Sequence, residues 1–351
     1  MKEEILENFR NNKKTFNAFK DRLIYLVRDL IEKENIIPHQ IIGRTKDISS
    51  LSKKIDKKGD KYNHLSDITD VIGLRVITYL ESDVDPIAQI IEKEFEKDEE
   101  NSIDKRILKN DQFGYRSLHV VVSLNDKRIK LPEYSKYKSI KCEIQIRSIL
   151  QHAWAEIEHD LGYKGIDVPD NYKRSFNRVA ALLETADLEF VKLKSQLTNY
   201  EKDVPELIEN KPEEVDINKA SISSFIQKSL IIAEIKKTIT EATGHGLRLA
   251  SNYNLVIAIL KYFDIGTIKA LKTILEENKI QYFEFLKHYI DVRDFKRVLS
   301  ENVVLTYFGN YLALSKNDPG ELERYLQSFG PDKVDELTQD LLKAYRESKG
   351  Y

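Results

Sequence analysis

Residues 113–119 read FGYRSLH and bring an aromatic ring and three polar groups to the start of an apolar run, VVVSL. The apolar run is typical of a buried strand. Tyr115 is followed by Arg116, a serine and His119, whose side chains can each contact phosphate. An ordinary strand entry does not need this cluster, so we expect these residues to serve a binding site.

A second group of polar residues lies in the segment 43–61, which has seven basic and three acidic residues. If this segment is helical, Lys46, Ser50 and Lys54 fall on one face at i, i+4 and i+8. The opposite face is apolar and consists of Ile48, Leu51 and Ile55. The polar stripe suits a polyphosphate. The alternative is a solvated, lysine-rich helix.

The segment DITDVIGLRVIT places Asp70 just before a predicted strand and Arg75 within it. An arginine in a strand that is buried on at least one face needs a partner or a ligand. The alternative to a ligand is an ion pair with Asp67 or Asp70, and Arg75 alone does not decide between the two. If neither pairs with it, Arg75 is available to a ligand.

The stretch 141–147 alternates strictly between apolar and polar residues. Its polar face consists of Lys141, Glu143, Gln145 and Arg147. This face carries a carboxylate, an amide and a guanidinium in a row, which suits the floor of a cleft as well as an exposed sheet face. Glu143 and Asp70 could share a hard cation, because Mg²⁺ takes one or two carboxylates together with substrate phosphates.

The sequence HAWAEIEHD places His152, Glu156 and His159 at helical spacing. Such spacing can mimic a metal site, but there is no third histidine nearby and no HExxH motif. We expect these histidines to bond neighbouring carboxylates.

The elements that must position these residues form an α+β arrangement over residues 1–200. A helix is predicted over 3–37, strands at GLRVITYL, SLHVVVSL and IKCEIQIRS, and helix again from 150 to about 197. The predicted sheet is mixed or antiparallel and is flanked by helices. Two prolines and many charges make 201–216 a predicted linker, and residues 217–351 read as a separate, all-α domain.

The whole chain of 351 residues has a net charge of −2, so any anion site must be local. A single cysteine excludes an internal disulfide and a thiolate zinc site. The N-terminus has no apolar signal core, and no apolar run is long enough to span a membrane. The sequence therefore predicts a cytoplasmic protein with no membrane partner.

Four motifs, taken in order, resemble the RelA/SpoT family of pyrophosphokinases. They are GRTKDISSLSKK, DVIGLRV, FGYRSLH, and EIQIR followed by HAWAEIEHDLGYK, and they span about residues 40–164. The resemblance implies a nucleotidyltransferase-like fold. It also implies transfer of the β,γ-pyrophosphate of ATP to a ribose 3′-hydroxyl.

The resemblance implies a role for each matching residue. Arg44 and Arg75 would sandwich the adenine of ATP, and Lys46, Ser50 and Lys54 would contact its phosphates. Asp70 and Glu143 would bind Mg²⁺, and Glu143 would also help to deprotonate the attacking hydroxyl. On the acceptor side, Tyr115 would stack on the base and His119 would hold phosphates, with lesser contributions from Arg116, Gln145 and Arg147.

The acceptor stays open at this point. Alarmone-making members carry a proline–lysine pair and an asparagine before the Gly-Tyr, whereas here Phe113 takes the asparagine position and Lys109 is displaced. The expected acceptor is GDP or GTP, giving (p)ppGpp. The alternative is the 3′-CCA end of tRNA, as in toxic members of the family, with residues 217–351 as a restraining domain. A third hypothesis is a catalytically silent nucleotide-binding interaction protein.

Two further expectations concern architecture. Only about 40 residues precede Gly43, so the His-Asp hydrolase domain of long family members is not expected. The C-terminal helices are expected to bind a protein partner or to contribute to a homo-oligomer.

Overall fold

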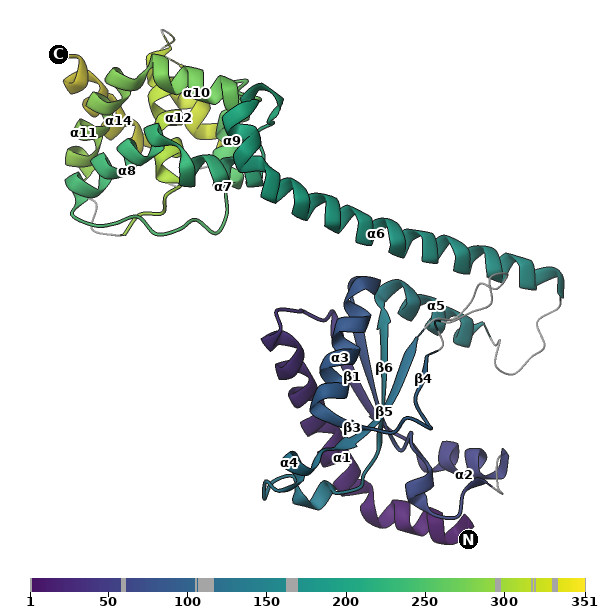
Figure 1. Ribbon diagram of the computed structural model, residues 1–351. Helices are drawn as coiled ribbons and strands as arrows, with labels where there is room; N and C mark the ends of the chain where they lie inside the picture. The colour runs from purple at the N-terminus through teal and green to yellow at the C-terminus, as the bar shows by residue number, and fades with distance from the viewer. Residues whose placement is uncertain are drawn as a thin grey trace. The chain divides into compact units, whose positions relative to one another are not determined.

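The computed structural model describes residues 2–57, 61–104, 106, 117–161, 170–293, 298–316, 318, 320–329 and 334–350. It divides into two compact units, Met1–Ser195 and Gln196–Tyr351, which are traced in Figure 1. Figure 1 places a sheet with helices in the first unit and helices alone in the second. The predicted α+β fold followed by a helical region is confirmed.

The first unit is built on a six-stranded mixed sheet in the order β1-β2-β6-β5-β3, with β4 paired to β5. Its strands are β1 (Gln40–Thr45), β2 (Ile72–Thr78), β3 (Phe95–Lys97), β4 (Ile103–Asp104), β5 (Leu118–Leu124) and β6 (Cys142–Ser148). Neighbouring strands are antiparallel except for β2 and β6, which are parallel. The strands β2, β5 and β6 were predicted from the sequence, whereas the short strands β1, β3 and β4 were not.

Helices flank the sheet in the first unit, and the apolar face of the sheet is buried in a common core. They are α1 (Lys2–Lys33), α2 (Ile48–Lys57), α3 (Val84–Glu94), α4 (Asp126–Ile129) and α5 (Ile149–Asp160). Buried residues of α1 and α3, such as Leu23 and Ile87, belong to one core with Leu74 of β2 and Ile144 of β6. Burying this face leaves the opposite, polar face of β1, β2, β6 and β5 to build a site.

Gly43 of β1 allows α1 to lie close to the sheet. A Cβ atom at this position would come within 2.8 Å of both Ile24 Cδ1 and Lys20 Cγ, which is too close for any side chain to fit without movement. The glycine thus fixes the spacing between α1 and the strand that carries Arg44.

The second unit is helical and has its own apolar core, to which Val204, Phe225, Leu271, Phe285 and Phe308 belong. Its helices are α7 (Lys219–Lys228), α8 (Leu230–Thr243), α9 (Asn254–Tyr262), α10 (Ile268–Glu277), α11 (Lys279–Arg293), α12 (Val303–Ser315), α13 (Glu321–Ser328) and α14 (Val334–Lys349). Extended backbone at Ser229 separates α7 from α8.

The long helix α6 (Asp170–Asn210) runs through part of the segment predicted to be a linker, 201–216. Pro205 lies inside it. Val204 and Ile208 are buried in the core of the second unit, and this burial outweighs the helix-breaking tendency of the proline. Residues 212–214 then form a single 3-10 turn.

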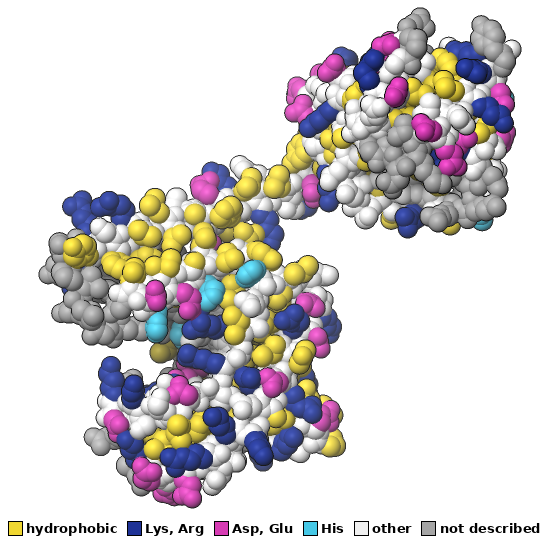
Figure 2. Space-filling model, turned by 180° about the vertical axis from the view of Figure 1, so that it is seen from behind, with side chains coloured by type: hydrophobic (Ala, Val, Ile, Leu, Met, Phe, Trp, Pro, Cys, Tyr) yellow, Lys and Arg dark blue, Asp and Glu magenta, His cyan; other side chains and the backbone are white. Residues whose placement is uncertain are grey.

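Between its packed positions α6 exposes large apolar side chains, seen as yellow patches along the helix in Figure 2. They are Val179, Leu182, Leu188, Phe190, Leu193 and Leu197. None of the helices in the described ranges is both long and apolar enough to cross a membrane.

Candidate functional site

The polar face of the sheet brings together predicted site residues from three strands. In the register of β1 and β2, Arg44 lies opposite Gly73, and Gly73 lies opposite Glu143 of β6. A Cβ atom at Gly73 would lie 3.5 Å from Arg44 Nε, an ordinary van der Waals distance, which places the arginine side chain over this part of β2. Arg44 and Glu143 therefore face the same space.

The next row of the same face continues towards β5. Arg75 of β2 lies opposite Gln145 of β6, and Gln145 lies opposite His119 of β5. The alternation predicted for β6 is confirmed, because Cys142, Ile144 and Ile146 are fully buried on the other side.

Two lysines converge on Asp70. Lys46 Nζ donates to Asp70 Oδ2 at 2.6 Å, and Lys54 Nζ donates to Oδ1 at 2.8 Å. Burial alone would raise the pKa of the Asp70 carboxyl, but the bonds from the two lysines more than offset this and hold the pKa below its ordinary value. Asp70 is therefore ionised at neutral pH.

The predicted helical stripe is only partly helical. Lys46 precedes α2 and its backbone N–H donates to Val71 O, whereas Ser50 and Lys54 lie on α2. Asp47 caps the helix by accepting from the backbone N–H of Ser50 at 2.8 Å, and also from the Ser50 hydroxyl at 2.7 Å. The Ser50 hydroxyl is thus bonded within the helix start, and contact with a phosphate would require it to leave Asp47.

Glu143 is held by its neighbours on the polar face. Its Oε1 lies 3.1 Å from His119 Nδ1 and accepts from Gln145 Nε2 at 2.7 Å. His119 Nε2 lies 2.6 Å from Ser117 Oγ. The chain Ser117–His119–Glu143 fixes the orientation of the carboxylate and offers it a route for a proton.

The alternative of an ion pair between Arg75 and Asp67 or Asp70 is wrong in its partner. Arg75 Nη1 instead donates to Glu156 Oε1 of α5 at 2.6 Å. Asp67 accepts from backbone N–H groups at Asn63 and His64. Arg75 and Glu156 are 81 residues apart, which explains why sequence patterns did not reveal the pair.

Arg147 lies at the end of β6 and its side chain is 1% exposed, with Nη2 3.5 Å from Glu156 Oε1. In this structure Arg147 contacts the Glu156 carboxylate. Its contact with an acceptor stays a prediction. His152 Nδ1 lies 3.7 Å from the same carboxylate oxygen. Burial and the nearby Arg147 lower the pKa of His152, so this imidazole is neutral at pH 7.

A small pocket of about 80 Å³ opens on the polar face between these groups. Its lining consists of Ile42, Arg44, Asp70, Gly73, Leu74, Arg75, Glu143 and Gln145. The pocket therefore joins both predicted adenine-contacting arginines to both predicted metal-binding carboxylates. Two carboxylates on one pocket match the donor set that Mg²⁺ takes alongside phosphates. Within the described ranges no cluster of three or more His, Cys, Asp or Glu side chains forms a metal site by itself.

Four residues of the predicted acceptor side, Lys109, Phe113, Tyr115 and Arg116, lie outside the described residues. His119 and Gln145 are the predicted acceptor-side residues that the structure places beside Glu143.

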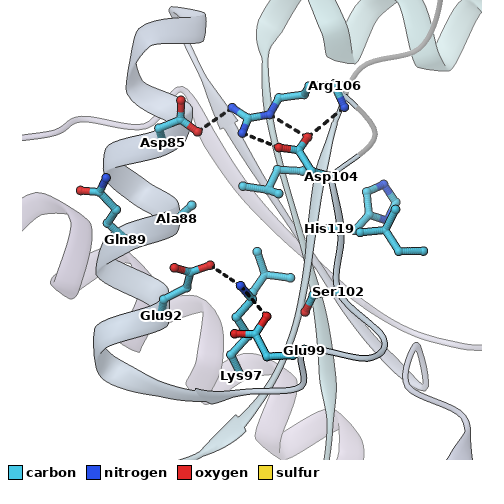
Figure 3. Close-up of a pocket in the computed structure, with 13 residues that line it drawn as sticks. Asp85, Ala88, Gln89, Glu92, Lys97, Glu99, Ser102, Asp104, Arg106 and His119 are labelled. Carbon is cyan, nitrogen blue, oxygen red and sulfur yellow. Dashed lines mark hydrogen bonds and ion pairs between the residues drawn. The ribbon is translucent and has the colours of Figure 1, made fainter. Parts of the chain in front are cut away.

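A larger and more polar pocket of about 440 Å³ lies between α3 and the strands β3–β5 (Figure 3). Two cations bridge carboxylates across it. Arg106 contacts Asp85 and Asp104, each at 2.7 Å. Lys97 contacts Glu92 at 2.7 Å and Glu99 at 2.9 Å. Sequence patterns gave no signal for this pocket, because its charges come from separate elements.

Comparison with known proteins identifies the region that carries the site. Residues 43–167 match the region found in RelA / SpoT proteins. This part of the chain is thus similar to the RelA/SpoT family. The matched region contains all four motifs and every lining residue of the small pocket except Ile42.

The chain also aligns with two curated relatives from Bacillus subtilis (strain 168). The GTP pyrophosphokinase YjbM is 27% identical over 160 residues, which cover 45% of this chain and 72% of the relative. The GTP pyrophosphokinase YwaC is 28% identical over 183 residues, which cover 48% of this chain and 79% of the relative.

Among solved structures, a GTP pyrophosphokinase family protein from Streptococcus pneumoniae aligns at 29% identity. It covers 55% of this chain and 94% of its own, with a TM-score of 0.44. The small alarmone synthetase 1 from Bacillus subtilis bound to its product pppGpp aligns at 25% identity. It covers 54% of this chain and 96% of its own, also with a TM-score of 0.44.

Proposed function

We propose that this chain is a pyrophosphokinase that transfers the β,γ-pyrophosphate of ATP to the ribose 3′-hydroxyl of GDP or GTP. The observation that carries the proposal is the small pocket in the RelA/SpoT region, where Arg44, Arg75, Asp70 and Glu143 meet. The names of the two curated relatives support a GTP pyrophosphokinase rather than another transferase.

In this proposal the adenine lies between the guanidinium groups of Arg44 and Arg75, which stack well on a planar base. Lys46 and Lys54 turn from Asp70 to the phosphates when ATP binds, since both ammonium groups already lie at the edge of the site. Each lysine thus exchanges a carboxylate partner for a phosphate.

Asp70 and Glu143 would hold Mg²⁺, which supplies charge neutralisation to the phosphates during transfer. The carboxylates fit this role because they share one pocket and because Asp70 is ionised at neutral pH. When the two lysines leave Asp70, its carboxylate oxygens become available to such an ion.

Glu143 accepts the proton of the attacking 3′-hydroxyl. The ribose oxygen forms a bond to the β-phosphorus of ATP, the bond from that phosphorus to the α–β bridging oxygen breaks, and AMP leaves. His119, 3.1 Å from Glu143 Oε1, orients the carboxylate for this step. Positioning of the two substrates supplies most of the rate enhancement, as in other phosphoryl transfers.

A second candidate acceptor is the terminal adenosine of tRNA. It is favoured by the separate helical unit Gln196–Tyr351, which has its own core and could restrain a toxic activity. Phe113 in place of the expected asparagine also favours it.

The test is to incubate the full chain with γ-labelled ATP and Mg²⁺ and to offer GDP, GTP and deacylated tRNA in parallel. Label in GDP or GTP supports the proposal, and label in tRNA alone supports the second candidate. Binding of ATP without label transfer to any acceptor would favour a catalytically silent nucleotide-binding protein.

A further inference from the structure

Glu156 of α5 is placed to control the orientation of Arg75. Its carboxylate Oε1 accepts from Arg75 Nη1 at 2.6 Å, across the edge of the polar face. The Arg75 side chain is 29% exposed and lines the small pocket, so without a partner it would sample many orientations. A guanidinium stacks on a base only when its plane is parallel to the ring.

The carboxylate is itself anchored. Helix α5 begins with a capping box between Ser148 and Gln151, and Trp154 is buried against Phe176 of α6. These contacts hold α5 at the end of β6 and against α6, and therefore hold the backbone from which Glu156 extends.

A buried cation also contacts this oxygen of Glu156. Arg147 is 1% exposed, and its Nη2 lies 3.5 Å from Glu156 Oε1. Arg147 cannot follow a mobile partner, because it is enclosed in the protein. Glu156 thus joins an immobile cation at the end of β6 to the cation that faces the pocket.

We infer that Glu156 is a positioning residue that holds the Arg75 guanidinium in the orientation that receives the base of the nucleotide donor. This inference rests on the proposed function, since it assigns the base subsite of that same pocket. It predicts that loss of Glu156 weakens recognition of the base and leaves recognition of the phosphates unchanged, because Lys46 and Lys54 are held by Asp70 and not by Glu156.

The test uses the full chain with Glu156→Ala and the milder Glu156→Gln, which keeps the shape of the side chain. The matched control is Asp160→Asn, which removes an exposed carboxylate from the same helix. Two probes are titrated by calorimetry: a non-hydrolysable ATP analogue, which has a base, and inorganic tripolyphosphate, which has none. Thermal melts followed by circular dichroism verify that each variant is folded.

We expect Glu156→Ala to raise the dissociation constant of the ATP analogue and the KM for ATP about fivefold. This factor corresponds to the roughly 1 kcal/mol of a half-exposed ion pair. The dissociation constant of tripolyphosphate and kcat stay within about twofold. In an Arg75→Ala background, Glu156→Ala has no further effect, because its partner is already gone.

Equal weakening of the ATP analogue and tripolyphosphate would overturn the inference, as would an unchanged affinity for the analogue in a folded variant. A full additive loss in the Arg75→Ala background would also overturn it. If the wild-type chain binds tripolyphosphate and the ATP analogue but transfers no label, the proposed activity fails while the positioning role is still decided by the binding data.

Discussion

The ion pairs that Asp70 forms with Lys46 and Lys54 lead us to predict how Asp70 affects the stability of the first unit. This prediction does not depend on catalysis. We consider Asp70→Asn, which removes the charge at nearly constant volume. The side chains of Asp70, Lys46 and Lys54 are 18%, 13% and 26% exposed, so this cluster is neither fully buried nor freely solvated. The substitution leaves two ammonium groups side by side without a counter-charge.

The expected cost lies between two limits. An exposed ion pair contributes up to about 1 kcal/mol, whereas breaking a buried pair costs about 3–5 kcal/mol. We therefore expect Asp70→Asn to lower the free energy of unfolding of the first unit by about 2–3 kcal/mol near pH 7. A control, Asp21→Asn, removes an exposed carboxylate from α1 that is paired only with Lys20, and it should cost less than about 0.5 kcal/mol.

Urea unfolding followed by tryptophan fluorescence measures this directly. Trp154 is the single tryptophan of the chain and is 5% exposed in the first unit, so its signal reports on that unit. The pKa of Asp70 is lower in the folded than in the unfolded protein. The stabilisation is therefore complete above the unfolded pKa of about 4 and is lost as the pH falls through the folded value. The difference between wild type and variant should shrink in acid. A difference below 0.5 kcal/mol at about pH 7, or one that is undiminished in acid, would refute the reasoning.

Three other substitutions and truncations test separate parts of the account. Tyr115→Ala should raise the KM for the acceptor far more than that for ATP, and Tyr115→Phe should be mild because stacking needs only the ring; equal losses on both substrates would contradict the acceptor assignment. Gly43→Ala should destabilise the first unit by about 1–3 kcal/mol in the same urea assay, because its Cβ would overlap Ile24 and Lys20; an unchanged midpoint would show that α1 moves away freely. A protein that ends at Ser195 should stay folded and be at least as active as the full chain, because the second unit has a separate core; a folded but inactive truncation would show that the helices help to hold the substrate.

The central strands could be predicted from the sequence because their apolar residues alternate or run continuously. Cys142, Ile144 and Ile146 all face the core, as their spacing required. The strands β3 and β4 were not predicted, because they are short or resemble their neighbours in sequence. β4 has only two residues, and β3, Phe95–Lys97, continues the charged pattern of α3. The chain leaves the helical conformation at Ser229, between α7 and α8, although neither a glycine nor a proline marks this boundary in the sequence.

The contacts between the candidate-site residues were harder to predict from the sequence than the elements that carry these residues. Lys46 and Lys54 were expected to lie on one helix, yet Asp47 starts the helix after Lys46. The two lysines still meet, because the turn between β1 and α2 brings Lys46 to Asp70. The partner of Arg75 could not be predicted, since it depends on the packing of α5 against the sheet. Local spacing determines which residues share a face, whereas only the assembled fold determines which charges pair.

The transfer rate of Glu143→Gln tests the central claim most directly, since this carboxylate is assigned both to Mg²⁺ and to the proton of the 3′-hydroxyl. The variant keeps nearly the same volume, and Glu133→Gln, at an exposed position outside the pocket, is the matched control. With γ-labelled ATP and the acceptor that wild type labels, we predict that Glu143→Gln transfers at less than a tenth of the wild-type rate, a barrier increase above about 1.4 kcal/mol. The control should transfer at the wild-type rate. A folded Glu143→Gln protein that keeps more than a tenth of the rate would contradict the account.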